Sequence, residues 1–128
     1  MSMAGRLRVR DYLDHIVQAI ERINRYVAAE DRDGFLQDEK TQDAVIRNIE
    51  IIGEAARNVE RVAPEYAAAH PEIPWPVICA MRNRVSHGYF EVDLDLVWRT
   101  VQTDLPVLER QMHTLISTID TELASDQE

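Results

Sequence analysis

The residues best suited to chemistry in this sequence lie close together, within positions 82–89. This segment reads Arg-Asn-Arg-Val-Ser-His-Gly-Tyr. Histidine can exchange a proton near neutral pH, and the arginine guanidinium is always charged, with a planar fork of donors that suits phosphate. A base beside a phosphate-binding arginine is what RNA cleavage by attack of its own 2′-hydroxyl requires. The segment therefore predicts phosphodiester chemistry on RNA by a route that requires no metal ion.

Helical geometry limits how these side chains can cooperate. The pattern predicts a helix over about residues 75–87, on which Asn83 and Arg84 share the face of His87. Arg82 is five positions from His87, or about 140° around an ideal helix. Arg82 and His87 can therefore serve one site only if the helix end distorts or a second copy contributes. A two-fold dimer would bring two such segments together and supply a second histidine to protonate the leaving 5′-oxygen.

A purely structural interpretation fits the same residues. His87 and Arg84 at a helix C-terminus would stabilise the helix dipole, and Gly88 would be an ordinary residue to end the helix. A short motif without context does not decide between the two interpretations.

The apolar residues that must position this segment recur every three or four residues, which predicts helices. We expect four main helices, over about 11–29, from 38 or 41 to 63, 75–87 and 93–119, and one short helix over 64–69. A break is expected at 31–34 and a kink at Pro106, because proline removes a backbone hydrogen bond. Gly53 lies inside a helix, where it predicts close approach by a neighbouring backbone. The expected fold is all-α, an antiparallel helical bundle.

The chain of 128 residues suits one domain. We expect a flexible N-terminus over 1–10, a single helical domain over 11–119 and a flexible C-terminal tail over 120–128. The net charge of −9 means that any RNA site must be a local basic patch, and it suits a protein partner with a basic face.

Several classes of site and location are not expected. Cys79 is the single cysteine, so no intrachain disulfide can form, which fits the cytoplasm. No apolar run is long enough for a membrane span. No cofactor is expected, since no glycine-rich phosphate loop appears. No metal site is expected either, because no two histidines lie four apart and there is no cysteine pair.

The spacing Arg82-x4-His87-x-Tyr89 resembles the motif of HepT-like toxins in the HEPN ribonuclease superfamily. The resemblance extends beyond this motif and covers roughly residues 11–115, with the matched positions at 38–48, 51–56, 71–75, 92–94 and 97–98. Many matched positions at consistent spacing are more specific than one short motif.

This resemblance implies a HEPN-like helical fold and a homodimer with the RNA cleft between its subunits. It implies a metal-independent endoribonuclease that acts as the toxin of a type VII-like toxin–antitoxin pair. Its catalytic residues would be Arg82 and His87, with Asn83 and Arg84 in support. The implied antitoxin is an MntA-like nucleotidyltransferase that silences the toxin by transferring AMP onto Tyr89.

Two alternatives remain at this point. The chain could be a non-catalytic helical binding partner of a nucleotidyltransferase, which its acidic charge would favour. It could also be a structural dimer without a site, in which case substitutions in the motif would change stability alone.

Overall fold

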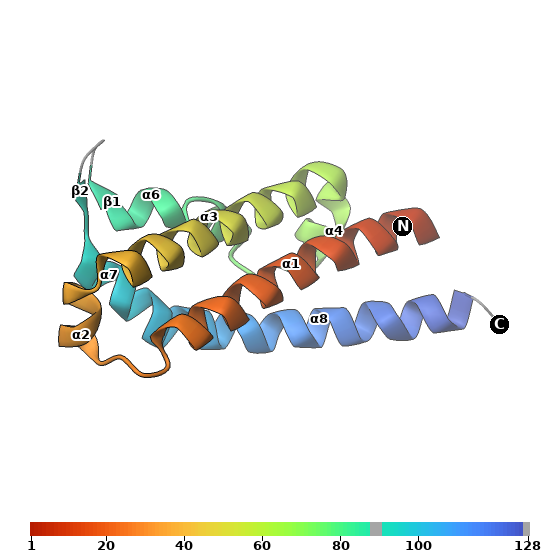
Figure 1. Ribbon diagram of the computed structural model, residues 1–128. Coiled ribbons are helices and arrows are strands. Elements are labelled where there is room, and N and C mark those ends of the chain that lie inside the picture. The colour runs from red at the N-terminus through yellow and green to blue at the C-terminus, as the bar shows by residue number, and fades with distance from the viewer. Residues whose placement is uncertain (88–90, 127–128) are drawn as a thin grey trace.

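Helices form most of the computed structural model, which describes residues 1–87 and 91–126 (Figure 1). In chain order the elements are α1 (Met3–Val27), α2 (Arg32–Gln37), α3 (Glu39–Val62), α4 (Pro64–Ala69), α5 (Trp75–Cys79), α6 (Met81–Val85), β1 (Ser86–His87), β2 (Glu91–Val92), α7 (Leu94–Arg99), the π-helix η1 (Thr100–Asp104) and α8 (Leu105–Asp126). The prediction of an all-α fold is confirmed, and so is the short helix over 64–69.

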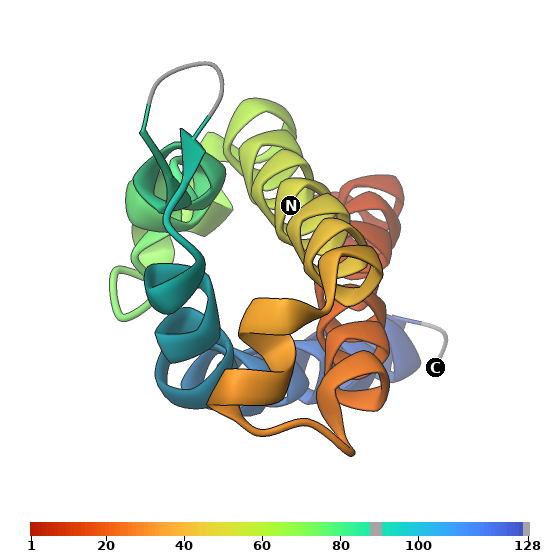
Figure 2. The ribbon, with the colours of Figure 1, turned by 60° about the vertical axis from the view of Figure 1, so that its left-hand side comes forward.

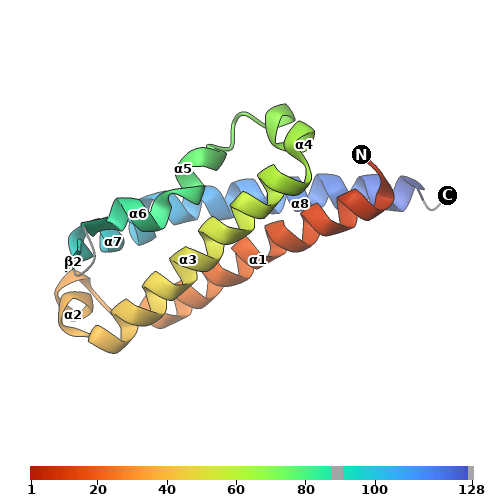
Figure 3. The same cartoon turned by 90° about the horizontal axis from the view of Figure 1, so that it is seen from above.

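Three long helices build the core. Helix α1 packs along α3 and α8 and runs antiparallel to both, so the two chain ends lie at the same end of the bundle (Figures 1 and 3). The apolar stripes predicted from the sequence face inward, and Ile20, Ile52 and Met112 are fully buried among them. None of the helices in the described ranges combines the length and apolar character that crossing a bilayer needs.

Both ends of the described chain are helical, so the expected helix bounds are corrected: the first helix begins at Met3 and not near residue 11, and the last continues to Asp126 and not only to 119. Helix α1 begins at Met3, where the Ser2 hydroxyl accepts a hydrogen bond from the first turn. Arg6 pairs with Glu122 and Asp126, and Arg10 pairs with Asp120. These partners are more than 100 positions apart in sequence, so local pattern reasoning could not find them.

The break expected at 31–34 lies slightly earlier, over residues 28–31, and a short helix, α2, follows it. The Asp31 carboxylate accepts a hydrogen bond at 2.7 Å from the backbone amide of Gly34 and so caps α2. The helix buries Phe35 against Trp98 of α7, with 5.3 Å between the ring centroids. This contact holds α2 at the end of the bundle opposite the chain termini (Figure 1).

The last predicted helix is divided into α7, η1 and α8. Asp93 caps α7 through the amide of Leu96, as expected. A kink was expected at Pro106, and the structure has a π-helical turn over Thr100–Asp104, just before this proline. A proline has no amide hydrogen to donate to the preceding turn, and a wider turn absorbs that loss.

Candidate active site

The segment singled out in the sequence lies where a helix gives way to a short β-hairpin. The single helix expected over 75–87 is two short helices, α5 and α6, followed by β1. Strand β1 pairs antiparallel with β2, with Ser86 opposite Val92 and His87 opposite Glu91. His87 therefore belongs to a strand, and the helical faces predicted to join it to Asn83 and Arg84 do not apply. On the expected helix, Arg82 and His87 could share a site only with a distorted helix end or a second copy. The helix ends at Val85, so His87 does not follow the expected helical path.

Close backbone packing fixes α5 and the start of α6 against α3. A Cβ atom added at Gly53 would lie 3.2 Å from the carbonyl oxygen of Cys79 and 3.4 Å from that of Ile78. The expected close approach at Gly53 is thus confirmed. At the other end of the segment, the Asp93 amide donates a 2.7 Å hydrogen bond to the Val85 carbonyl, which ties the chain after the hairpin back to α6.

Helix α6 presents its polar residues to solvent. Met81 and Val85 are buried and lie four positions apart, so they anchor one face of the helix. The three residues between them, Arg82, Asn83 and Arg84, are exposed. Figure 2 shows α6 and the two strands on the side of the bundle away from α1.

Arg82 is held by a carboxylate from α3. Its Nε donates a 2.7 Å hydrogen bond to Oε1 of Glu50, and its side chain remains 54% exposed. No further hydrogen bond or ion pair reaches its guanidinium from the residues that the structure describes. The two terminal nitrogens of Arg82 bond to none of the described residues, so in this part of the chain they can donate to a phosphate.

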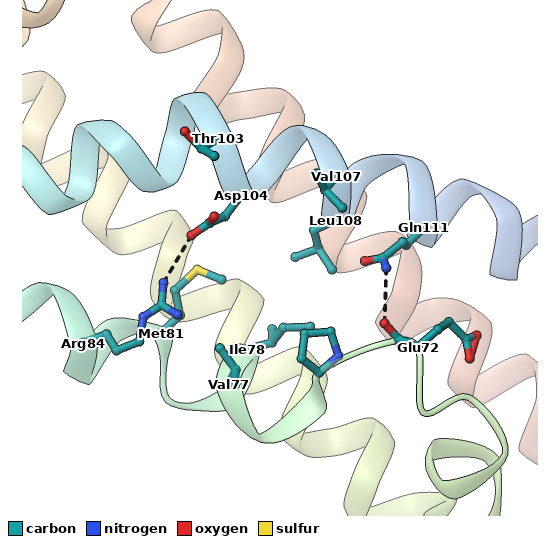
Figure 4. Close-up of a pocket in the computed structure, with 11 residues that line it drawn as sticks. Glu72, Val77, Ile78, Met81, Arg84, Thr103, Asp104, Val107, Leu108 and Gln111 are labelled. Atoms are coloured by element: carbon teal, nitrogen blue, oxygen red, sulfur yellow. Dashed lines mark hydrogen bonds and ion pairs between the residues drawn. The ribbon is translucent and has the colours of Figure 1, made fainter.

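Arg84 is held in a similar way by η1, at the edge of a groove. Its Nη2 donates to Oδ2 of Asp104 at 3.2 Å. The groove has a volume of about 390 Å³ and lies between α5–α6 and η1–α8 (Figure 4). Its apolar lining includes Val77, Ile78, Met81, Val107 and Leu108.

The sequence missed Glu50 and Asp104, and no local signal marked either of them. They are 32 and 20 positions from the arginines that they hold. The resulting surface is less basic than expected, since each motif arginine carries a carboxylate partner.

The remaining predicted site residues are placed only in part. Asn83 is exposed on α6 and makes no hydrogen bond with the described residues. The backbone of His87 is described, but its side chain is not. Gly88 and Tyr89 lie outside the described residues. The structure therefore brings Arg82, Asn83 and Arg84 onto one short helix that runs directly into the strand of His87.

The single cysteine is unsuited to nucleophilic chemistry. Cys79 is half-buried, and its thiol donates to Oε1 of Glu60 at 3.2 Å. Burial, with this hydrogen bond to a carboxylate, raises the pKa of the Cys79 thiol to about 11. The reactive thiolate is therefore scarce near neutral pH.

Comparison with known families finds a match over most of the chain. Residues 16–115 match the family model described as "Ribonuclease HepT-like". This range contains α3, α5, α6, both strands and the first half of α8, so it includes every element that builds the site.

Individual relatives agree with this match. The chain is 42% identical over 106 residues to "Probable ribonuclease HepT" of Thermococcus cleftensis, covering 83% of this chain and 94% of that protein. It is 34% identical over 107 residues to a "Putative RNase" of Caldanaerobacter subterraneus, covering 84% and 93%. It also matches about half (49%) of a two-function protein of Methanocaldococcus jannaschii, "Gamma-glutamylcyclotransferase and putative RNase", with 38% identity over 88% of this chain. No solved structure matches.

Proposed function

Since this chain belongs to the HepT-like ribonuclease family and is on that ground an endoribonuclease, we propose that it cuts RNA with Arg82 and His87 and without a metal ion. The observation that carries this proposal is the exposed and oriented guanidinium of Arg82. Glu50 accepts a hydrogen bond from its Nε. His87 follows five residues later, on the strand that begins where α6 ends.

In the proposed reaction, His87 accepts the proton of the RNA 2′-hydroxyl. The 2′-oxygen forms a bond to phosphorus as the bond from phosphorus to the 5′-oxygen breaks, which leaves a 2′,3′-cyclic phosphate and a 5′-hydroxyl. A second histidine gives its proton to the departing 5′-oxygen. The terminal nitrogens of Arg82 donate to the non-bridging oxygens as their charge grows. Arg84 and Asn83 support the bound phosphate chain.

A homodimer with the cleft between its subunits would supply the second histidine. Support comes from the groove beside Arg84, where Val77 is 44% exposed and Val107 is 46% exposed on opposite walls. Apolar side chains of this size gain free energy when a partner covers them. A two-fold axis close to this groove would bring two α6–β1 segments together.

The proposed regulation acts on Tyr89. We propose that the chain is the toxin of a type VII-like toxin–antitoxin pair in the cytoplasm, and that an MntA-like nucleotidyltransferase silences it by adding AMP to Tyr89. The added group is a bulky anion two residues from His87, so it would repel RNA phosphate and obstruct the cleft. The net charge of −9 supports recognition by a partner with a basic face.

The test compares intact mass, oligomeric mass and RNA cleavage in EDTA. Protein made alone is expected to be an unmodified dimer that cuts RNA to cyclic-phosphate ends. Protein made with its nucleotidyltransferase is expected to carry AMP mass and to be silent, and Tyr89→Phe is expected to escape both effects. His87→Ala should abolish cleavage, while His70→Ala, which changes a histidine paired with Glu72 outside this segment, should retain it. Unmodified wild type that leaves RNA intact would contradict the proposal.

A second function, a non-catalytic binding partner of a nucleotidyltransferase, has one observation in its favour. Both motif arginines already carry carboxylate partners, on a chain that is acidic overall. It predicts a stable complex with the nucleotidyltransferase and no cleavage by the unmodified chain, so the same experiment separates the two functions.

A further inference from the structure

The contact between α1 and α8 changes character along its length. Near the chain ends, ion pairs join the two helices. The arginines are on α1 and the carboxylates on α8: Arg6 pairs with Glu122 and Asp126, and Arg10 pairs with Asp120. The helices run antiparallel, so residues further along α1 meet residues nearer the start of α8 (Figure 3).

In that part of the contact, two carboxylates and an imidazole converge. Ligand atoms of Glu21 on α1 and of Glu109 and His113 on α8 all lie within 4.8 Å of one another. No hydrogen bond or ion pair reaches any of the three from residues 1–87 or 91–126. The arginines that neutralise carboxylates near the chain ends have no counterpart bonded to this group.

We propose that Glu21, Glu109 and His113 bind a divalent transition-metal ion between α1 and α8. Glu109 and His113 are four positions apart on one helix, so their side chains lie on the same face, and Glu21 reaches them from across the helix contact. The ion would neutralise the two carboxylates. One imidazole nitrogen with two carboxylate oxygens suits zinc and neighbouring metals, whereas magnesium and calcium prefer sets of oxygen ligands alone.

This site differs in its ligands from the histidine-pair and cysteine-pair sites that the sequence argued against. The expectation of no metal rested on pairs of histidines or cysteines, and a Glu-x3-His pair completed by another helix falls outside both patterns. It also stands apart from the proposed ribonuclease chemistry, which uses residues of α6 and β1. The expected role of the ion is to join α1 to α8, so metal binding should stabilise the fold. Removal of the ion with EDTA should leave RNA cleavage unchanged.

The test is titration of the EDTA-stripped full chain with zinc chloride, followed by calorimetry and thermal unfolding. We expect one saturable site per chain and a Tm that rises with zinc and returns to its starting value with excess EDTA. His113→Ala and Glu21→Gln each remove a ligand and should weaken binding by about tenfold or more. Both side chains are exposed, so the variants should fold, which circular dichroism checks.

His15→Ala is the matched control, since His15 is an exposed histidine also on α1, and its zinc affinity should equal that of wild type. The proposal is overturned if the wild type shows no saturable binding, or if zinc binds equally well to His113→Ala. Equal competition by magnesium would overturn the assignment to transition metals.

Discussion

Two regions of this molecule pair arginine with carboxylate, and they use the pair differently. In the contact between α1 and α8, Arg6 and Arg10 are mostly covered, with 22% and 33% of their side chains exposed, and they join two long helices. In the α6 segment, Arg82 and Arg84 are 54% and 41% exposed and extend from a helix of five residues.

The difference lies in what each guanidinium still has to offer. Arg6 bonds two carboxylates and Arg10 donates two hydrogen bonds to one, so both are committed to α8. Within residues 1–87 and 91–126, Arg82 and Arg84 each donate one hydrogen bond, and both keep part of the side chain open to solvent. An ion pair can therefore either join two helices or orient a side chain toward a ligand. The two uses differ in how many hydrogen-bond donors of the guanidinium remain unpaired.

Replacement of the arginines should separate these uses most strongly. Arg82→Ala removes the group proposed to stabilise charge on phosphorus, so kcat/KM for RNA cleavage should fall by about 10²–10³-fold with little change in Tm. Arg6→Ala should leave cleavage unchanged and lower Tm slightly, because its carboxylate partners are open to solvent and ion pairs of that kind contribute about 1 kcal/mol or less. Single-turnover cleavage and thermal unfolding measure both effects. A loss of stability in Arg82→Ala as large as its loss of cleavage would show that Arg82 is structural.

A smaller effect should follow from Glu50, which accepts a hydrogen bond from Arg82 Nε and so orients the guanidinium. Glu50→Ala frees the guanidinium to rotate, and we expect kcat to fall by about tenfold, with KM nearly unchanged, because a misplaced donor is lost chiefly from the transition state. Glu50→Gln keeps an acceptor oxygen for Nε and should recover most of the rate.

Glu54→Ala is the control for Glu50, since Glu54 is exposed one turn further along α3. A rise in kcat for Glu50→Ala would give the opposite conclusion, that Glu50 competes with phosphate for Arg82.

The long helices were predictable because their cores follow a local period. Residues such as Ile16, Ile20 and Ile23 recur on one face, and that face is the buried one. The helix ends were less predictable, because their partners are remote. The Arg6 and Arg10 pairs with α8 extend the helical region at both termini, and the burial of Phe35 against Trp98 stabilises α2 in a segment that resembles a turn.

The residues of the candidate site stay a prediction from the sequence, and its geometry was not predictable. Residue types and spacing point to Arg82, Asn83, Arg84 and His87, but a single helix was expected over 75–87. Its division depends on packing against α3 at Gly53 and on the hydrogen bond from Asp93 to Val85. Glu50 and Asp104 come from other helices, so no sequence pattern near the motif contains them.

The smallest expected effect belongs to the α1–α8 contact and depends on pH. The hydrogen bond from Arg10 lowers the pKa of the Asp120 carboxyl. A carboxyl with a lowered folded-state pKa stabilises the protein above its unfolded-state pKa, about 3.9, and this contribution disappears as pH falls through the folded-state value. Asp120→Asn should therefore reduce the free energy of unfolding by about 0.5 kcal/mol at pH 7 and by progressively less below pH 4. Urea unfolding of wild type and variant across this range measures the difference.

Asp43→Asn is the control, at an exposed position on α3, and it should show no such trend. If the effect of Asp120→Asn stayed constant down to pH 2, Asp120 would stabilise the contact by packing and not by charge.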